Sequence, residues 1–367
     1  MTRVCHMTSA HPWDDVRIFH KECRSLAASG FDVHLVACAP RKMQIDGVSV
    51  HAIQRKNGCR VGRMVKTACD VYRAARNLDA EIYHIHDPEL IPYALLLKWR
   101  GKKVIYDAHE DVPRDILSKS WIPSWVRKPL SLIWETLENF AAKRLSSVVA
   151  ATPHIAQRFV TVNPSTVDVN NFPIDNELTG QSGEKTKAPR TICYIGGISD
   201  VRGAFEMVRA LEFVDATLIL AGSFQSAELE GALRALPGWA KVDYRGVVSR
   251  EGVAQILAES RIGLVLLHPL TNYIDALPVK MFEYMSAGLP VLASDFPLWR
   301  SILSDTGAGV CVNPLDPCAI AECISNVLLE EEQAQVMGDA GRRAVLHTFR
   351  WKHEADKLVS LYQKLKS

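Results

Sequence analysis

The sequence lacks any long hydrophobic run. Its longest apolar stretches, residues 92–97 and 262–267, are far shorter than the ~20 residues that a helix needs to cross a bilayer. The first twelve residues, MTRVCHMTSAHP, also lack the apolar core of a secretory signal. We therefore expect a cytoplasmic protein without a transmembrane helix.

Paired cysteines and internal repeats are missing too. The nine cysteines are odd in number and scattered, and no two of them form a Cys-x-x-Cys pair. Such cysteines are typical of reduced core residues rather than of a disulfide framework. No repeat of fixed period is present, and a hydrophobic content of 48% excludes a disordered chain.

The chain of 367 residues is long enough for two domains. Short apolar runs alternate with segments of helical periodicity, and this pattern predicts parallel sheets joined by helical crossovers. The expected strands are residues 4–8, 33–37, 82–86, 104–107, 148–151, 191–195, 217–221, 242–245, 262–267 and 290–294.

A polar stretch, DNELTGQSGEKTKAPR, interrupts this pattern at residues 175–190 and predicts a linker. We expect two Rossmann-like domains with doubly wound parallel sheets. Ligands bind such sheets at the carboxyl ends of the strands, so we expect the site in a cleft between the domains. The expected parts are an N-terminal domain (1–172), a linker (173–190), a C-terminal domain (191–350) and a last helix (351–367) that can return to the N-terminal domain.

The first chemical motif is TICYIGGISDVRGAFE at residues 191–206. A buried strand runs into Gly196 and Gly197, and a helix begins near Arg202. Glycines allow close backbone approach, a helix N-terminus attracts anions, and the arginine suits a diphosphate. The glycine spacing matches neither G-x-G-x-x-G nor the Walker loop, which disfavours ordinary dinucleotide or ATP binding. A tight turn without any ligand is the alternative interpretation.

The second motif is NYIDALPVKMFEYMSAGLPVLASDF at residues 272–296, and it predicts a helix over 278–287. Asp275 precedes this helix and Glu283 lies within it, so two carboxylates can hold hydroxyl groups of one ligand. Lys280 lies near the positive end of the helix dipole, where it can face a phosphate.

These two motifs resemble glycosyltransferase family 4, which comprises retaining enzymes with the GT-B fold, including those of bacterial surface-polysaccharide synthesis. The second motif is similar to the family's Glu-x7-Glu region, with Asp275 where the family usually has its first Glu. The first motif is similar to the family's glycine-rich donor loop. The resemblance spans both halves of the chain and implies a GT-B fold, in which two Rossmann-like domains face an interdomain cleft.

The resemblance also implies a role for each motif residue. Glu283 would bind the ribose of a nucleotide-sugar, Arg202 would neutralise its diphosphate with Lys280 beside it, and Asp275 with the N–H groups after it would hold the donor sugar or phosphate. The turn that follows the strand at 242–245 would contact the nucleobase through its backbone. The implied donor-binding residues are Gly196, Gly197, Val247, Val248, Ala276, Leu277 and Glu283.

Polar side chains also follow two expected strands of the first domain, at HIHDPEL (84–90) and YDAHEDVPRD (106–115). A metal cluster is one interpretation, and histidines satisfied within the core are another. The side chains competent as metal ligands are His84, His86, Asp87, His109 and Glu110.

The resemblance implies a third interpretation of these segments. His109 stands where the family has a histidine that contacts the donor sugar and phosphate, so it joins Arg202, Lys280 and Asp275 as an implied catalytic residue. The first loop, residues 9–19, has no glycine, although many family members have a glycine-rich loop there. We assign that loop to the acceptor side. The expected acceptor-side residues are His11, Asp14, Asp15, Arg17, Asp107, Glu110 and Asp111.

The segment 120–144 interleaves Trp121, Trp125 and Trp134 with basic residues on an amphipathic helix. This composition is typical of an interfacial membrane contact, and core packing of the same tryptophans is the alternative. Residues 1–170 contain 24 Lys and Arg against 17 Asp and Glu, whereas the remainder contains 19 against 24. A basic first half favours an anionic partner such as a phosphate-bearing molecule or a membrane surface.

Together these observations predict a retaining glycosyltransferase that needs no metal ion or cofactor and binds no nucleic acid. It would move a sugar from a nucleoside-diphosphate sugar, UDP-linked, to a hydroxyl of a glycan or a polyprenyl-diphosphate-linked acceptor. Peripheral contact with the inner face of the cell membrane through residues 120–144 is part of this expectation. A nucleotide-sugar epimerase and a non-catalytic sugar-binding subunit are the alternatives.

Overall fold

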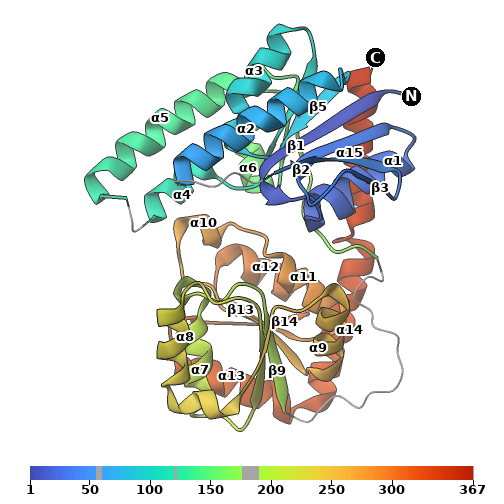
Figure 1. Cartoon of the computed structure of the whole chain (residues 1–367). Helices are drawn as coiled ribbons and strands as arrows, with labels where there is room; N and C mark the ends of the chain where they lie inside the picture. The colour runs from blue at the N-terminus through green and yellow to red at the C-terminus, as the bar shows by residue number, and fades with distance from the viewer. Residues whose placement is uncertain (55–59, 120–121, 176–189, 367) are drawn as a thin grey trace. The chain divides into compact units, whose positions relative to one another are not determined.

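The computed structural model describes residues 1–54, 60–119, 122–175 and 190–366 (Figure 1). The chain forms two compact units. Unit 1 comprises Met1–Asn171 with the C-terminal segment Trp351–Ser367, and unit 2 comprises Phe172–Arg350. The predicted linker falls largely on residues 176–189, outside the described residues.

Unit 1 is built on a sheet with the strand order β3-β4-β2-β1-β5-β6-β7-β8, in which neighbouring strands are parallel except β3 and β4. The strands β3, β4 and β8 are absent from the sequence prediction, because these short strands near the edges are half-exposed and have no continuous apolar run. The bounds are β1 (Arg3–Pro12), β2 (Asp32–Cys38), β3 (Met43–Ile45), β4 (Val48–Ile53), β5 (Ile82–Ile85), β6 (Lys103–Ala108), β7 (Ser147–Ala150) and β8 (Thr166–Asp168).

Helices cover both faces of this sheet (Figure 1). The C-terminal helix α15 packs on η1, α1 and β8, and the Trp351 indole N–H donates to Ser25 Oγ at 2.9 Å. The bounds are η1 (Val16–Cys23), α1 (Arg24–Ala28), α2 (Arg60–Asn77), η2 (Pro88–Leu90), α3 (Ile91–Trp99), α4 (Val112–Ser118), α5 (Ser124–Ala142), α6 (Pro153–Val160) and α15 (Trp351–Lys366).

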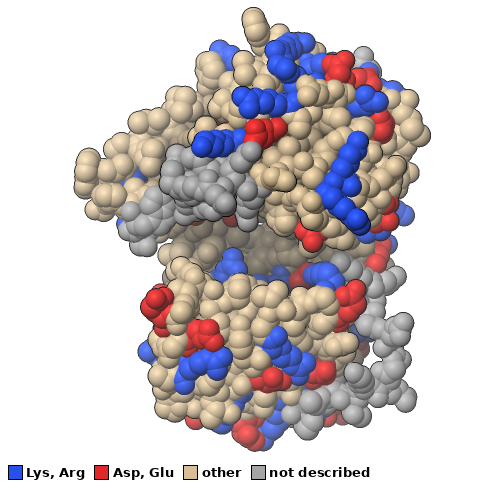
Figure 2. Space-filling model, viewed as in Figure 1, with Lys and Arg blue, Asp and Glu red and all other residues tan. Residues whose placement is uncertain are grey.

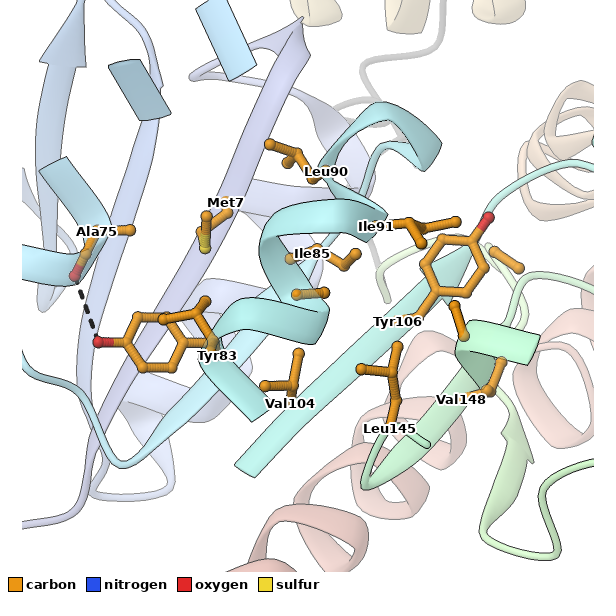
Figure 3. Packing of buried hydrophobic residues seen from close by; sticks show 14 of the residues in the cluster. Met7, Ala75, Tyr83, Ile85, Leu90, Ile91, Val104, Tyr106, Leu145 and Val148 are labelled. Atoms are coloured by element: carbon orange, nitrogen blue, oxygen red, sulfur yellow. Dashed lines mark hydrogen bonds between the residues drawn. The ribbon is translucent and has the colours of Figure 1, made fainter. Parts of the chain in front are cut away.

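One apolar core of unit 1 lies between the central strands and the helices packed on them (Figure 3). Val104 and Tyr106 of β6 alternate with residues that face the other side, as the two-residue period of a strand requires. The Tyr83 hydroxyl at the edge of this core donates to the Ala75 carbonyl at 3.4 Å. This core holds the carboxyl ends of β1, β5 and β6 together.

Unit 2 is a parallel sheet with the order β11-β10-β9-β12-β13-β14 and an apolar core on each face. The order reverses between β9 and β12, which is where ligands bind in open sheets of this kind. The strand bounds are β9 (Thr191–Ile195), β10 (Thr217–Ala221), β11 (Val242–Gly246), β12 (Ile262–Val265), β13 (Val291–Ser294) and β14 (Gly309–Val312).

The helices of unit 2 follow the predicted alternation. Among the described residues of this unit, β14 is the one strand that the sequence pattern does not predict, because three of its four residues are partly exposed. The helix bounds are η3 (Asp200–Arg202), α7 (Ala204–Ala210), α8 (Ala227–Arg234), η4 (Pro237–Lys241), α9 (Arg250–Glu259), α10 (Thr271–Ile274), α11 (Val279–Ser286), α12 (Pro297–Thr306), α13 (Pro317–Leu329) and α14 (Glu331–His347).

The expected fold class, two α/β units on parallel sheets, is confirmed. Within the described ranges, none of the helices combines the length and the apolar composition that crossing a membrane requires. The eight cysteines in those ranges are all free, and Cys59 lies outside them.

Candidate functional site

The glycine pair after β9 makes room for two basic side chains in unit 2. Gly196 has a φ of +138°, which side-chain-bearing residues rarely adopt, and a Cβ on it would lie 3.0 Å from the Lys280 Nζ. A Cβ on Gly197 would lie 2.9 Å from Arg202 Nη1. The conformation of Gly196 therefore favours glycine, and the absence of a side chain at Gly197 leaves room for the Arg202 guanidinium.

The ammonium group of Lys280 is buried. Its Nζ has no hydrogen-bond partner among the described residues, and it lies 3.8 Å from the ring centroid of Tyr194. Burial and the neighbouring Arg202 charge lower the pKa of Lys280 to about 7. A buried cation without a partner is costly, so this position favours an incoming anion.

Arg202 is held beside Lys280 by the turn between η3 and α7. Its Nη1 donates to the Gly197 carbonyl at 3.4 Å. Gly203 ends η3 in the left-handed conformation, with a φ of +71°, and any side chain there would collide with the Leu266 carbonyl oxygen. The Arg-Gly pair in the sequence therefore positions a guanidinium at the end of β9.

Glu283 lies on α11, where its Oε1 accepts a hydrogen bond from Arg250 Nη1 at 2.8 Å. Arg250 is the first residue of α9. The sequence analysis does not single it out, because only the packing of α9 against the sheet brings it to Glu283. The carboxylate is thus paired with a guanidinium.

The other expected donor-binding residues occupy loops of unit 2. Asp275 is exposed after α10, and Val247 is 78% exposed after β11. The Ala276 N–H donates to the Tyr273 carbonyl at 3.1 Å, and its own carbonyl accepts from the Trp299 indole at 2.7 Å. The Ala276 N–H is therefore already occupied, which differs from the expectation of an available donor.

The remaining two, Leu277 and Val248, are partly buried. Both pack against one of the apolar cores of unit 2. They can therefore contribute backbone groups and shape to a donor site, but little polar side-chain chemistry.

Unit 1 contains a separate cavity of about 600 Å³ at the carboxyl ends of β1, β5 and β6. Its walls are rich in carboxylates and imidazoles. Three of the expected acceptor-side residues line it, together with His109, whereas Asp87 and Glu89 enter as further carboxylates. The polar lining used below is His11, Asp87, Glu89, Asp107, His109 and Glu110.

Asp87 holds the carboxyl-terminal part of β1. It accepts hydrogen bonds from the Ser9 N–H at 2.6 Å and from the Thr8 hydroxyl at 2.8 Å, and His11 Nδ1 lies 2.9 Å away. Burial opposes ionisation of Asp87, but these donors outweigh it and hold the pKa below its usual range. The same contact raises the pKa of His11. Residues 9–12, which the sequence predicts as part of a loop, therefore extend β1 and are held by the Asp87 side chain.

The Asp107 carboxylate orients the His109 imidazole through a hydrogen bond. The His109 Nε2–H donates to Asp107 Oδ2 at 2.9 Å, and His86 Nδ1 lies 3.2 Å from the same oxygen. Burial disfavours the charge on Asp107, but the Arg17 guanidinium, 2.9 Å away, and His109 hold its pKa well below the ordinary value. The arrangement leaves an ionised carboxylate at the base of the cavity.

Arg17 has a place other than the acceptor side to which the sequence analysis assigns it. It is 5% exposed, and its Nη1 donates to the Val169 carbonyl at 2.7 Å while its other nitrogens face Asp107 and Glu22. The reason is that η1 packs inward and turns this side chain beneath the cavity. Arg17 therefore supports Asp107 rather than the acceptor.

Three other expected acceptor-side residues do not line the cavity either. Asp14 is exposed, and Asp15 caps η1 by accepting from the N–H groups of Arg17 and Ile18. Asp111 precedes α4 and lies 3.6 Å from Arg114. Their acidic pattern in the sequence thus reflects helix starts more than a binding surface.

The histidines of the possible metal cluster divide between two places. His109 faces the cavity, whereas His84 is fully buried with His6 and lies beside the hydroxyl of Tyr362. His86 reaches both groups. The two sets of potential ligands are His6, Glu22, His84 and His86, and His86, Asp107 and His109.

Comparison with known proteins bears on these two sites. Residues 16–177 match the family described as Glycosyltransferase Family 4, and residues 175–344 match the family described as Glycosyl transferases group 1. The two matches are consecutive and cover both units. The chain belongs to glycosyltransferase family 4.

Named relatives of this glycosyltransferase agree with that assignment. The GDP-mannose:cellobiosyl-diphosphopolyprenol alpha-mannosyltransferase of Xanthomonas campestris is 24% identical over 77% of this chain and 74% of its own length. The phosphatidyl-myo-inositol mannosyltransferase of Mycobacterium tuberculosis is 26% identical over 54% of this chain and 53% of its own. The protein is an enzyme that transfers glycosyl groups.

Solved structures share its fold. Sucrose-phosphate synthase of Thermosynechococcus elongatus superposes with a TM-score of 0.79 at 16% identity, covering 100% of this chain and 99% of its own. HepE of Anabaena in complex with UDP gives 0.74 at 13% identity, covering 99% and 100%. The glycosyltransferase therefore has the GT-B fold that the resemblance implies.

Proposed function

We propose that this glycosyltransferase moves a sugar, with retention of configuration, from a nucleoside-diphosphate sugar to a hydroxyl group of a glycan or lipid-linked acceptor. The observation that carries the proposal is the pair of cations at the Gly196–Gly197 turn, of which the Lys280 ammonium has no hydrogen-bond partner among the described residues. The buried Lys280 ammonium and the Arg202 guanidinium together suit a diphosphate, which brings the negative charge that unit 2 lacks at this position.

Glu283 completes the proposed donor site. Its carboxylate can accept hydrogen bonds from the two ribose hydroxyls once Arg250 shares or releases it. The sequence predicts a uridine nucleotide as the donor, but the name of the Xanthomonas relative specifies GDP-mannose, so both UDP and GDP are candidates. Asp275, with Leu277 after it, would meet the donor sugar.

No described carboxylate stands out as a nucleophile at the donor site, so we propose displacement on one face of the sugar. The bond from the anomeric carbon to the diphosphate oxygen breaks, and the acceptor oxygen bonds to the same face. The departing diphosphate oxygen takes the proton of the acceptor hydroxyl. Arg202 and Lys280 stabilise the charge that develops on that oxygen, and His109, whose Nε2–H donates to Asp107, accepts a hydrogen bond from a hydroxyl of the donor sugar through Nδ1.

We assign the acceptor to the cavity of unit 1. Asp87, Glu89 and Glu110 offer acceptors for sugar hydroxyls, and burial together with the Asp87 charge raises the pKa of Glu89. A wall of this kind repels a phosphate or carboxylate and favours a neutral, hydroxyl-rich group. The named relatives fit such a role, because one of them glycosylates a cellobiosyl lipid.

The decisive experiment is a binding panel with UDP, GDP, ADP, dTDP and NAD, with and without a divalent metal ion. We expect one nucleoside diphosphate to raise Tm without metal, since binding to the folded state stabilises it. Lys280→Met should abolish that shift, whereas Lys241→Met, on the same unit, should keep it. Stabilisation by NAD alone would contradict the proposal.

The same panel separates the alternative functions. An epimerase would convert the donor sugar without an acceptor, and a non-catalytic subunit would bind the nucleotide without turnover. The named relatives are transferases, which disfavours both.

We also propose that α5 contacts a membrane that carries a lipid-linked acceptor. The helix exposes a stripe of large apolar side chains, and the side shown in Figure 2 carries few charges along it. Basic residues flank the stripe, and the Arg144 guanidinium lies 3.4 Å from the Phe140 ring centroid. Trp134 agrees with the core-packing alternative, because its indole nitrogen is buried, and Trp121 lies outside the described residues. The exposed stripe is Trp125, Leu132, Ile133, Leu137 and Phe140.

Sedimentation with lipid vesicles tests this surface. We expect the protein to sediment with vesicles that contain anionic lipid and much less with zwitterionic ones, because both apolar insertion and basic residues contribute. A double variant with Leu132→Ser and Leu137→Ser should no longer sediment with the vesicles. Phe213→Ser, which removes an equally exposed apolar residue from unit 2, should have no effect. Equal binding by all variants would contradict the assignment to α5.

A further inference from the structure

A group of polar residues beneath the cavity of unit 1 takes no part in the proposed transfer. His6 of β1 and His84 of β5 are register partners on adjacent strands, and His86 follows β5 directly. Glu22 reaches the same point from η1. None of the four side chains is accessible to solvent beyond 2%.

The Glu22 carboxylate is aimed at all three imidazoles. Its Oε2 lies 4.0 Å from His6 Nδ1, 3.9 Å from His84 Nδ1 and 4.0 Å from His86 Nε2. Neither of its oxygens accepts a hydrogen bond from a described residue. A buried, ionised carboxylate that accepts no hydrogen bonds is unfavourable, because no donor offsets the free energy of removing it from water.

Nearby charges do not provide that compensation fully. Arg17 Nε lies 3.0 Å from Glu22 Oε1, but the same guanidinium makes its hydrogen bonds to Asp107. One cation therefore faces two buried carboxylates. Either a retained proton or a bound cation must balance this carboxylate.

We propose that His6, His84, His86 and Glu22 form a structural zinc site in the core of unit 1. Three imidazoles and one carboxylate are a ligand set that suits Zn²⁺, and four protein ligands without an open position are typical of a structural site. Tetrahedral ligands about 2.0 Å from zinc lie roughly 3.3 Å apart. The His6–His86 separation of 2.8 Å and the three separations from Glu22, 3.9 to 4.0 Å, bracket that value, and all four ligand atoms lie within 4.8 Å of one another.

The surroundings of His86 and His6 support this assignment, whereas His84 Nδ1, the nitrogen that faces Glu22, also lies 2.7 Å from the Tyr362 hydroxyl. A zinc-bound histidine usually donates its second ring N–H to a carboxylate or another acceptor. His86, with Nε2 toward the centre, has Nδ1 3.2 Å from Asp107 Oδ2. His6, with Nδ1 toward the centre, has Nε2 3.1 Å from the Tyr362 hydroxyl. The ion would thus join η1, β1 and β5 beneath α15.

The test is the metal content of the full chain, expressed without an affinity tag in zinc-supplemented medium and dialysed. We expect about one zinc per chain, and a chain refolded with Co²⁺ should show the strong visible absorption of tetrahedral cobalt. Glu22→Gln and His84→Ala should each lower the zinc content at least tenfold. The control variant His34→Ala should retain the zinc. His34 is half-buried in the same unit, and its Nδ1 lies 2.9 Å from His51 Nε2.

Two further measurements test where the zinc ion lies and whether it is bound at all. His109→Ala should retain zinc, and loss of zinc in this variant alone would place the ion at the cavity and overturn the proposal. Where the core variants fail to fold, the wild-type chain decides. Zinc below a tenth of an ion per chain, with no fall in Tm after chelation, would show that a proton balances Glu22. Nucleoside-diphosphate binding to unit 2 is measured in parallel, so this site and the proposed function fail separately.

Discussion

The two units treat buried charge in opposite ways at the carboxyl ends of their strands. In unit 1, Asp107 is surrounded by Arg17, His86 and His109, and Asp87 accepts from two hydroxyl or amide donors and faces His11. In unit 2, the Lys280 ammonium is buried with no hydrogen-bond partner in the described part of the chain, and the Arg202 guanidinium lies nearby.

This difference indicates which kind of ligand each unit favours. A site whose charges are already balanced gains little from binding another charge, and it selects for shape and hydroxyl groups instead. A site with excess buried positive charge gains most from an anion. Unit 1 therefore suits a neutral sugar and unit 2 suits a diphosphate, and each prediction below tests one side of this contrast.

The largest expected effect is that of His109→Ala in unit 1. Removing a positioned hydrogen-bonding group at the reacting sugar should lower kcat by roughly 10²- to 10⁴-fold. His154→Ala, an exposed histidine in the same unit, should leave kcat within about twofold. If steady-state kinetics show equal values for both variants, His109 belongs to the structural network and not to the reaction.

Arg202→Ala in unit 2 should follow, with a loss of about 10²- to 10³-fold in kcat, because the guanidinium stabilises charge that develops on the leaving diphosphate. Nucleotide affinity should fall by much less. Arg209→Ala, exposed on the adjacent helix α7, is the matched control. Equal losses in kcat and in nucleotide affinity would instead make Arg202 a ground-state anchor.

Glu283→Ala should weaken nucleoside-diphosphate binding by about ten- to a hundredfold, the range expected for lost hydrogen bonds to a charged group. Calorimetry on the variant and on Glu251→Ala, an exposed carboxylate of α9, measures the difference. Should Glu283 serve only to pair with Arg250, affinity would stay unchanged, and the ribose assignment would be wrong.

The smallest expected effect is a pH dependence of nucleotide affinity. Because the pKa of Lys280 is lowered to about 7, the free protein loses this charge as the pH rises above neutrality. Affinity should therefore weaken about three- to tenfold between pH 7 and pH 8. In Lys280→Met the weaker affinity should no longer change over this range, and an unchanged slope would remove Lys280 from the diphosphate site.

The same group makes a prediction for stability. The folded-state pKa of Lys280 lies below its unfolded value, so the unfolded chain binds more protons between about pH 7 and pH 10.4. The contribution of Lys280 to the free energy of unfolding should therefore rise with pH across this window. Denaturant titrations of the wild type and Lys280→Met should show this difference, with the variant more stable at pH 7 by about 1–3 kcal/mol.

Much of this architecture is predictable from local pattern. The strands β9 and β10 coincide with the expected ranges because fully buried parallel strands are short apolar runs between turn residues. The glycine pair and Arg202 are equally visible, since a turn that brings cations to the backbone needs residues without side chains. Short, half-exposed strands such as β3 and β8 leave no such pattern.

Contacts between segments that are far apart in the sequence cannot be predicted from local pattern. Arg250 is 33 residues from Glu283, and Tyr362 is 278 residues from His84, so neither pairing has a local signature. The acidic residues near position 15 illustrate the converse: their pattern predicts a binding loop, but Asp15 caps η1 and Arg17 turns inward under Asp107.

The amino-acid order thus determines the strands, the helices and the chemical types available at the end of each strand, because these depend on neighbours within a few residues. Which of those groups are paired and which are left uncompensated is decided by packing. Lys280 is unpartnered because the fold buries it against Tyr194 and Gly196, and Glu22 meets three imidazoles because β1, β5 and η1 converge. Burial and distance set the energy of a charge, and both exist only once the chain has folded.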